Sequence, residues 1–475
     1  MSFSQSSGAP GKGTLTRAQN MNATLSGTPI LSQLSVAPVG AFSLRAVNGV
    51  TAKAVNVVPG GSFPPSLMTQ SGATSSTQTL GSGGLFAGSY TASCSRSDYG
   101  NGAPGAFAGV YRYLVNRFLW QVNSYPVGGG SVSTPTTAGF NGEWLQLQTP
   151  FPINLTGYSV KCGDISSIVL LASTDASSWT LVDSTNSGLP GTITKTGLNF
   201  AGYSYFRFVV LVSTAIYPFL YEVKFNGTVP SLAQDFYADR LGNLLTAPVT
   251  GMDLATWLGG ATGYVATWYD QSGKGNDATQ GTAANQPIIQ RATKGPGFSA
   301  LFNGTTNYFT SSFNLLGTPF LICASTRRNT SAVNLTYVGI NGSSGLGNSL
   351  QVGYYNPSTQ VAVALGGTGA TITVPAYSAG SEPMAYDFLE MFATTGSGLG
   401  IEMWGVRNGS QVNGGNSSIT QLLTSSGNVL IGAMNSGSGI VNYFSGEMYE
   451  ILIFNQTITP YSTQIYNNQV GYTGL

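Results

Sequence analysis

The chain is built from short runs of β-branched and aromatic residues that are separated by glycine, asparagine and serine. Such runs stand at Ser166–Ala172, Tyr205–Leu211, Phe320–Ser325, Gln360–Leu365 and Tyr449–Phe454. Runs of this length between turn residues are typical of strands, and their spacing is typical of sandwiches and jelly rolls rather than of alternating strands and helices. The sequence therefore predicts an all-β protein.

Two short helices are predicted within this background. Residues Gly251–Leu258 are followed by Gly259 and Gly260, and glycine is a common helix stop. Near the C-terminus, Thr459 suits an N-cap and Pro460 suits the first position of a helix. We expect little other helical structure.

Charged residues are scarce in this chain. With 18 basic and 17 acidic residues, only 7% of the 475 residues are charged, against about 25% in an ordinary soluble domain. A net charge of +1 without a basic cluster excludes the electrostatic pattern of a nucleic-acid binder. A surface this poor in charge suits a protein that packs against copies of itself, so we expect a structural protein that self-assembles.

Several kinds of chemistry are excluded by residue type. The absence of histidine excludes Ser-His-Asp and Cys-His catalysis and any histidine-ligated metal. The cysteines Cys94, Cys162 and Cys323 are too widely spaced for a zinc cluster, and we expect neither a metal nor a cofactor. No apolar stretch reaches the length of about 18 residues that a membrane span needs. The N-terminus has no apolar core of a signal peptide, so we expect synthesis without one.

The segment Trp268–Gln280, WYDQSGKGNDATQ, resembles part of a concanavalin A-like sandwich. Sandwiches of this type occur in the catalytic domain of the arabinofuranosidase B family and in many virion-surface proteins of large DNA viruses. Residues 443–459, YFSGEMYEILIFNQTIT, resemble the closing strands of the same laminin-G-like fold. The resemblance covers about residues 229–475, and it implies either glycoside hydrolysis or a virion-surface role.

A second resemblance covers about residues 80–228. The segments Glu143–Pro150, Ile168–Asp183, Tyr203–Leu211 and Phe219–Gly227 follow one another in the order found in a discoidin-type (coagulation factor 5/8 C-type) jelly roll. This resemblance implies a second β-sandwich domain.

The order of the two resemblances implies an insertion. Gly40–Val57 resembles the first strands of the arabinofuranosidase-type sandwich, yet the next matching segment begins only near residue 229. Jelly rolls have termini that lie close together, which makes insertion into a loop tolerable. The expected organisation is an N-terminal arm (1–30), a sandwich (31–60 plus 229–475) and an inserted jelly roll (61–228). The alternative is that residues 31–60 belong to the arm.

Glycoside hydrolysis needs two carboxylates that lie about 5 Å or about 6.5–9.5 Å apart. None of the acidic residues in the sandwich lies in the nucleophile motif of the arabinofuranosidase family, so we expect no enzyme. Asp270 and Asn276 are expected instead to cap a tight glycine-rich turn. The acidic candidates in the sandwich are Asp235, Asp239, Asp253, Asp270, Asp277, Glu382, Asp387, Glu390, Glu402, Glu447 and Glu450.

Glycan binding is the more plausible chemistry, because both sandwich types commonly hold sugars on aromatic rings and on Asn, Asp and Gln side chains at loop ends. In the jelly roll, the loops Ser97–Ala108 and Tyr125–Asn141 lie at the expected ligand end. The alternative for each aromatic residue is packing in a core or an interface. The candidate set in the sandwich is Trp268, Tyr269, Asp270, Gln271 and Asn276.

Cys94 and Cys162 both fall in the inserted domain and are candidates for a disulfide, which would imply an oxidising compartment. Cys323 is expected to be a buried core thiol.

The function expected from these features is that of a viral structural protein, a self-assembling component of the virion surface or of a fibre. Its partners would be copies of itself and other virion proteins, and attachment to a host glycan would be a second role. The alternatives are an arabinofuranosidase-type glycosidase and a monomeric carbohydrate-binding adhesin.

Overall fold

The computed structural model describes most of the chain from residue 29 onward. For residues 354–427 it describes the backbone of the strands but not the side chains. The residues outside the description are 1–28, 70–72, 96–102, 108–117, 120–124, 187–188, 217, 294, 314, 316–319, 330–334, 341–349, 357–359, 366–367, 374–385, 395–397, 408–409, 420–427, 437, 456–463, 466, 470 and 473–475. The expected N-terminal arm therefore lies almost entirely outside the described residues.

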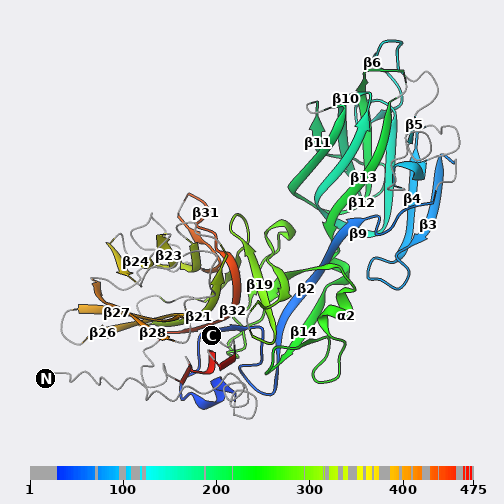
Figure 1. Cartoon of the computed structure of the whole chain (residues 1–475). Helices are drawn as coiled ribbons and strands as arrows, with labels where there is room; N and C mark the ends of the chain where they lie inside the picture. Colours follow the sequence, from blue (N-terminus) through cyan, green and yellow to red (C-terminus); the bar gives the residue numbers. More distant parts are fainter. Residues whose placement is uncertain are drawn as a thin grey trace.

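The described chain is almost entirely β, as predicted, and it forms two lobes (Figure 1). Each of the five apolar runs that predicted strands lies in a strand of the structure. The small lobe contains β3 (Ser75–Leu80), β4 (Gly88–Cys94), η2 (Ala103–Phe107), β5 (Phe118–Leu119), β6 (Gly130–Ser131), β7 (Thr136–Thr137), β8 (Phe140–Asn141), β9 (Trp144–Gly163), β10 (Ile165–Ser173), β11 (Thr180–Thr185), β12 (Gly191–Ser213) and β13 (Phe219–Thr228).

The large lobe contains the remaining elements, and β2 reaches into both lobes. Its first part is η1 (Ile30–Gln33), β1 (Gly40–Ser43), β2 (Thr51–Phe63), η3 (Pro230–Leu232), β14 (Gln234–Asp239), β15 (Leu244–Leu245), α2 (Leu254–Leu258), β16 (Thr262–Trp268), β17 (Ala278–Thr279), η4 (Ala283–Asn285), β18 (Ile288–Arg291), β19 (Phe298–Asn303) and β20 (Phe309–Ser311). The rest is β21 (Phe320–Arg328), β22 (Leu335–Ile340), β23 (Leu350–Asn356), β24 (Gln360–Leu365), β25 (Thr368–Thr373), β26 (Tyr386–Thr394), β27 (Gly398–Arg407), β28 (Ser410–Ile419), β29 (Val429–Ile431), β30 (Met434–Asn435), β31 (Ile440–Val441) and β32 (Ser445–Phe454).

The small lobe is organised around the long strand β9. Antiparallel partners β12, β13 and β4 all pair with β9, and β10 pairs with both β12 and β11. Aromatic side chains fill its core, where Phe206, Phe208 and Phe225 pack ring against ring with centroids 5.0–5.8 Å apart. Aromatic contacts of this kind stabilise a core beyond the area that they bury.

The large lobe is organised around β32, the last strand. Its antiparallel partners are β1, β19 and β21, so the beginning, middle and end of the lobe's sequence meet in one sheet. The core of this lobe is separate from that of the small lobe and includes Phe42, Trp268, Phe302 and Phe309. Burial of such side chains is the main favourable term in folding.

Two adjacent strand segments connect the lobes. The first part of β2 pairs with β14 and β16 in the large lobe, while Gly60–Phe63 at its end pairs with Phe225–Thr228 of β13. Figure 1 shows β2 as the blue strand that runs from one lobe to the other. The chain returns to the large lobe through β13 and η3, beside the point where it left.

The helix predicted at Gly251–Leu258 is present but shorter, as α2. It begins only after Asp253, because the Asp253 carboxylate accepts a hydrogen bond from the backbone N–H of Thr256 and so acts as the N-cap. Gly259 adopts the left-handed conformation, with φ of 55°, and ends the helix. The glycine pair at 259 and 260 predicted this stop. Thr459 and Pro460 lie outside the described residues, and helical residues follow them at 464–465, 467–469 and 471–472.

The disulfide considered for Cys94 and Cys162 is not present. Cys94 lies opposite Leu145, near the start of β9, whereas Cys162 lies at the other end of that long strand. Each thiol instead meets a backbone carbonyl, that of Thr74 for Cys94 and that of Gly191 for Cys162. Cys323 is fully buried, as expected.

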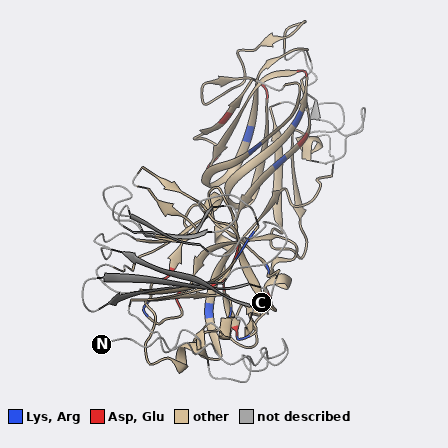
Figure 2. Ribbon diagram, turned by 60° about the vertical axis from the view of Figure 1, so that its left-hand side comes forward, with Lys and Arg blue, Asp and Glu red and all other residues tan. Residues whose placement is uncertain are grey.

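Charged residues are thinly scattered along the chain in both lobes (Figure 2). Of the helices in the described part of the chain, none has the length and apolar character needed to cross a membrane.

Candidate functional site

The loop between β16 and β17 carries the predicted candidate residues, and Asp270 organises it. Its Oδ1 accepts hydrogen bonds from the backbone N–H groups of Ser272 (2.8 Å) and Ala41 (2.8 Å). Its Oδ2 accepts from the Ser272 hydroxyl (2.6 Å) and the Asn276 N–H (3.0 Å). The turn-capping role predicted for Asp270 is therefore confirmed, and four donors occupy its carboxylate.

Asn276 and Asp277 complete this loop. The Asn276 side chain donates to the carbonyl of Val39 (2.6 Å), so it ties the loop to the segment before β1 rather than capping the turn. Asp277 Oδ1 accepts from the backbone N–H of Asp270 (2.9 Å). Gly273 and Gly275, with φ of 80° and 74°, allow the chain to reverse here.

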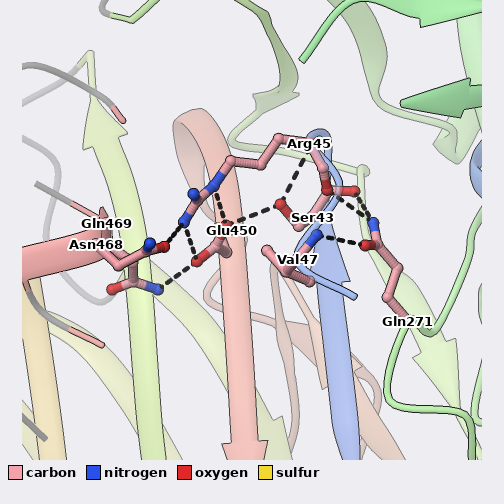
Figure 3. Close-up of polar contacts among 7 residues, drawn as sticks. All are labelled: Ser43, Arg45, Val47, Gln271, Glu450, Asn468 and Gln469. Carbon is pink, nitrogen blue, oxygen red and sulfur yellow. Dashed lines mark hydrogen bonds and ion pairs between the residues drawn. The ribbon is translucent and has the colours of Figure 1, made fainter. Parts of the chain in front are cut away.

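Gln271 fastens the loop to the segment that follows β1. Its Oε1 accepts from the Val47 N–H (2.9 Å), and its Nε2 donates to the carbonyls of Ser43 (2.9 Å) and Arg45 (3.0 Å), as Figure 3 shows. The side chain is only 5% exposed. Gln271 is therefore a positioning residue, and its amide is not available to a ligand.

The same segment is held from its other side by a buried ion pair (Figure 3). The Arg45 guanidinium bonds Glu450 of β32 through Nε (2.8 Å) and an Nη (3.1 Å). Glu450 also accepts from Ser43 (2.8 Å) and Gln469 (3.0 Å), and Arg45 donates to Asn468 (2.6 Å). Buried charges need this degree of hydrogen bonding to offset the cost of leaving water.

Trp268 is a core residue, which corrects its prediction as a glycan contact. The side chain is 0% exposed and packs against the rings of Phe42 and Phe309, with centroids 6.2 and 6.1 Å away. Because successive strand residues point to opposite faces, its neighbour Tyr269 faces outward and remains partly exposed.

A surface hollow with a volume of about 390 Å³ lies beside Tyr269. We call it the Tyr269 hollow. Of the predicted candidates it brings together Tyr269, Asp270 and Gln271, whereas Trp268 and Asn276 do not line it. Its lining comprises Asn48, Thr51, Ala52, Lys53, Tyr269, Asp270, Gln271, Gly273 and Asp277.

One side of the hollow is a small charged cluster centred on Asp235. Lys53 lies 2.8 Å from one carboxylate oxygen, and the Tyr269 hydroxyl (2.7 Å) and the Asn56 amide (2.9 Å) donate to the other. The Lys53 ammonium also lies 4.1 Å from the centroid of the Tyr269 ring, a cation–π distance. These contacts fix the orientation of Tyr269 at the edge of the hollow.

The cluster shifts the pKa values of its members. Burial alone would raise the pKa of Asp235, but hydrogen bonds from Lys53, Tyr269 and Asn56 outweigh burial and lower it. Burial alone would lower the pKa of Lys53, but its contacts with Asp235 and Tyr269 raise it. Burial, reinforced by Asp235, raises the pKa of Tyr269. Near neutral pH the cluster therefore holds one ammonium, one carboxylate and one neutral phenol.

The described carboxylates of the large lobe are engaged in structural contacts. Asp239 accepts from Leu241 and Asn243, and Asp253 caps α2. On β32, Glu447 pairs with Arg327, whereas Glu450 pairs with Arg45. The side chains of Glu382, Asp387, Glu390 and Glu402 lie outside the description, and the described residues contain no cluster of metal-binding side chains.

The two loops predicted to form the ligand end of the jelly roll are only partly described, and the described Tyr125 is buried. Much of Ser97–Ala108 lies outside the described residues. In the other loop, Tyr125 is buried and donates to the carbonyl of Val210 (2.6 Å). The conspicuous feature of this lobe is Arg207, whose guanidinium lies 4.0 Å from the Trp144 ring and 4.1 Å from the Trp179 ring. Burial lowers the pKa of Arg207 to about 10.

Sequence reasoning missed the residues that one segment contributes to the Tyr269 hollow and its cluster: Asn48, Thr51, Ala52, Lys53 and Asn56. They belong to β2 and the turn before it, far from the Tyr269 loop in sequence. The resemblance of Gly40–Val57 to the first strands of the sandwich was the available signal, because it predicted that this segment joins the same lobe.

No protein-family model matches this sequence, and comparison with curated proteins finds no match. Among solved structures, the chain is similar to a family 32 carbohydrate-binding module from Clostridium perfringens in complex with GalNAc-β-1,3-galactose (16% identity, TM-score 0.22, 29% of this chain and 92% of that chain). It is also similar to chitosan-binding module 1 from a chitosanase/glucanase of Paenibacillus sp. IK-5 (19% identity, TM-score 0.22, 29% of this chain and 92% of that chain). A third similar structure is a family 32 carbohydrate-binding module from Streptococcus pneumoniae (8% identity, TM-score 0.21, 33% of this chain and 98% of that chain).

These modules are discoidin-like β-sandwiches, the domain type that the resemblance of residues 80–228 named. With TM-scores near 0.2, the likenesses support no conclusion on function. The concanavalin A-like resemblance of the large lobe and the virion assignment stay predictions.

Proposed function

We propose that this chain is a glycan-binding surface protein without catalytic activity, and that its large lobe holds a sugar in the Tyr269 hollow. The observation that carries this proposal is the lining of the hollow. A carboxamide (Asn48), a hydroxyl (Thr51), an ammonium (Lys53), a carboxylate (Asp277) and a partly exposed aromatic ring (Tyr269) surround a single depression. Sugars present hydroxyl groups that donate and accept, together with C–H faces that pack on rings, and this lining offers partners for both.

The size and rigidity of the hollow support the same proposal. Its volume of about 390 Å³ falls within the range of about 300–1,000 Å³ that is usual for small-ligand sites. The hydrogen bonds of Asp270 and Gln271 hold its loop against the β1 segment before any ligand arrives. A preformed site loses less entropy when it binds.

We further propose that copies of the chain assemble on a virion surface or in a fibre. The support is the scarcity of charge, which lowers repulsion between copies and leaves association to apolar and hydrogen-bonded contacts (Figure 2). The resemblance of the Trp268–Gln280 segment to virion-surface proteins points the same way. Other virion proteins and a host glycan are the further partners in this proposal.

The glycan proposal is tested by a glycan array followed by calorimetric titration of the best ligand. Asp277→Asn removes a charge from the hollow but leaves an oxygen to accept the Asp270 N–H, and Asn48→Ala removes a carboxamide at the rim. We expect each change to weaken binding about tenfold, the loss of roughly one hydrogen bond to a sugar hydroxyl. Lys274→Ala is the matched control, because Lys274 is exposed in the same loop but does not line the hollow.

Wild-type affinity in both hollow variants would contradict binding at this place, and an array without any ligand would contradict glycan binding itself. A glycosidase would instead release free sugar from the bound glycan, which chromatography of the mixture detects.

Assembly is tested by light scattering of the purified chain and negative-stain microscopy of any large species. Rings, trimers or filaments are the expected result. A single species near the chain mass of 49.3 kDa would overturn self-assembly and leave a monomeric adhesin.

A further inference from the structure

A second hollow, with a volume of about 210 Å³, opens elsewhere on the large lobe. It lies between Tyr264 of β16, the end of η4, the strand β19 and Ser445 at the start of β32. We call it the Tyr264 hollow. It shares no lining residue with the Tyr269 hollow, and none of its lining residues is charged.

The walls of this hollow combine apolar and amide groups. Tyr264 is partly buried, and Ile288 and Leu301 extend the apolar wall. At the rim, Asn329 Oδ1 accepts a hydrogen bond from the Ser445 hydroxyl (2.7 Å), which fixes the exposed carboxamide. The Asn329 Nδ2 has no partner among the described residues and remains able to donate.

Gln286, one of the residues that line the hollow, carries a buried amide oxygen without a partner among the described residues. Gln286 is 5% exposed, and its Nε2 donates to the carbonyl of Gln280 (2.8 Å). The Gln286 Oε1 is buried and accepts no hydrogen bond from the described residues. Asn307, 4% exposed, holds the backbone here by donating to the Gln286 carbonyl (3.1 Å). A buried acceptor of this kind is costly unless a donor reaches it, so the site favours a ligand that brings one.

We propose that the Tyr264 hollow binds one neutral sugar ring. The apolar face of the ring packs on Tyr264, a ring hydroxyl donates to Gln286 Oε1, and a second oxygen accepts from Asn329 Nδ2. The volume is little more than half that of the Tyr269 hollow, which suits one ring and not a chain of rings. The uncharged lining selects a neutral ligand, because a charged group would lose its hydration without gaining an ion pair.

This site is independent of the glycan site in the Tyr269 hollow. A chain with both sites carries two separate sugar contacts on one lobe, and self-assembled copies would multiply them. Weak single contacts then add up to firm attachment by raising the effective concentration of each further contact.

The test is saturation-transfer difference NMR on the full chain with methyl glycosides of glucose, galactose, mannose and N-acetylglucosamine. Asn329→Trp places a bulky ring at the exposed rim and is expected to remove the part of the transfer that comes from the Tyr264 hollow. Asn329→Ala removes one donor and is expected to weaken binding about tenfold. Lys274→Ala on the surface is the control, Asp277→Asn reports the part of the transfer that comes from the Tyr269 hollow, and thermal melting verifies that each variant is folded.

The results separate the two sites. A fall in transfer in Asn329→Trp, with Lys274→Ala unchanged, supports the Tyr264 hollow whether or not Asp277→Asn also lowers the transfer. Loss in Asp277→Asn with wild-type transfer in Asn329→Trp overturns the Tyr264 site and leaves the first proposal standing. No transfer from the wild-type chain to any of the four glycosides also overturns the Tyr264 site.

Discussion

The large lobe contains two ion pairs with the same shortest N–O distance and different surroundings. Arg45 and Glu450 lie 2.8 Å apart with side chains 3% and 1% exposed, whereas Lys53 and Asp235 also lie 2.8 Å apart but are 39% and 35% exposed. Ser43, Asn468 and Gln469 give the buried pair further hydrogen bonds. The exposed pair borders the Tyr269 hollow. Equal distances therefore serve different purposes: the first pair fixes the fold, and the second is accessible to a ligand.

The largest expected effect comes from breaking the buried pair. Arg45→Met leaves Glu450 buried without its cation, and we expect a loss of about 3–5 kcal/mol in the free energy of unfolding. Urea denaturation measures this loss. The double variant Arg45→Met/Glu450→Leu is expected to recover most of it, because two apolar side chains leave no unpaired charge. A single variant as stable as the wild type would refute the structural role of the pair.

Gln271 is the next test, because it links this buried region to the loop of the hollow. Gln271→Ala removes one acceptor and two donor contacts and leaves the N–H of Val47 and the carbonyls of Ser43 and Arg45 without this partner. Each buried group left unpaired costs about 1–3 kcal/mol, so we expect a clear fall in stability together with weaker sugar binding. Unchanged affinity in a destabilised variant would show that the hollow does not depend on this fastening.

The third prediction concerns how the stability of the fold falls at acid pH, which we expect to depend on Glu447. Burial alone would raise its pKa, but hydrogen bonds from Thr293, Tyr449 and Ser299 outweigh burial and lower it below the ordinary value of 4.5. A carboxyl whose pKa is lower in the folded state stabilises the fold fully above its unfolded pKa, and that contribution is lost as the pH falls through the folded pKa. Glu447→Gln should therefore reduce stability near neutral pH and flatten its decline below about pH 4.5. A decline as steep as in the wild type would assign acid sensitivity to other groups.

The strands and the turn at Asp270 could be predicted from local sequence, but the orientation of Trp268 could not. In β16 the inward residues Gly263 and Val265 would place Trp268 outward by simple alternation. A β-bulge between Val265 and Thr267 reverses the alternation, so Trp268 points into the core and Tyr269 points out. The bulge depends on pairing with β2, which the sequence around Trp268 does not reveal.

The charged cluster around Asp235, beside the Tyr269 hollow, could not be predicted for a related reason. Asp235 and Asn56 face each other across the β2–β14 pairing, although the whole small lobe separates them in the chain. Lys53, which belongs to β2 like Asn56, reaches across to Asp235 of β14. Local patterns predict elements, whereas contacts of this kind depend on strand register, which the global fold decides.

The smallest expected change in stability, and the sharpest test of the comparison, is at the exposed pair. Lys53→Met should cost less than about 1 kcal/mol, because solvent screens a half-exposed ion pair. The same change removes a donor from the Tyr269 hollow and uncovers one face of the Tyr269 ring, so sugar affinity should change markedly while the melting temperature stays nearly constant. Asn48→Ala, which alters the rim without touching the ion pair, separates the loss of a donor from the loss of charge. A Lys53→Met variant that loses as much stability as Arg45→Met would mean that both pairs serve the fold and that the hollow is a by-product of strand packing.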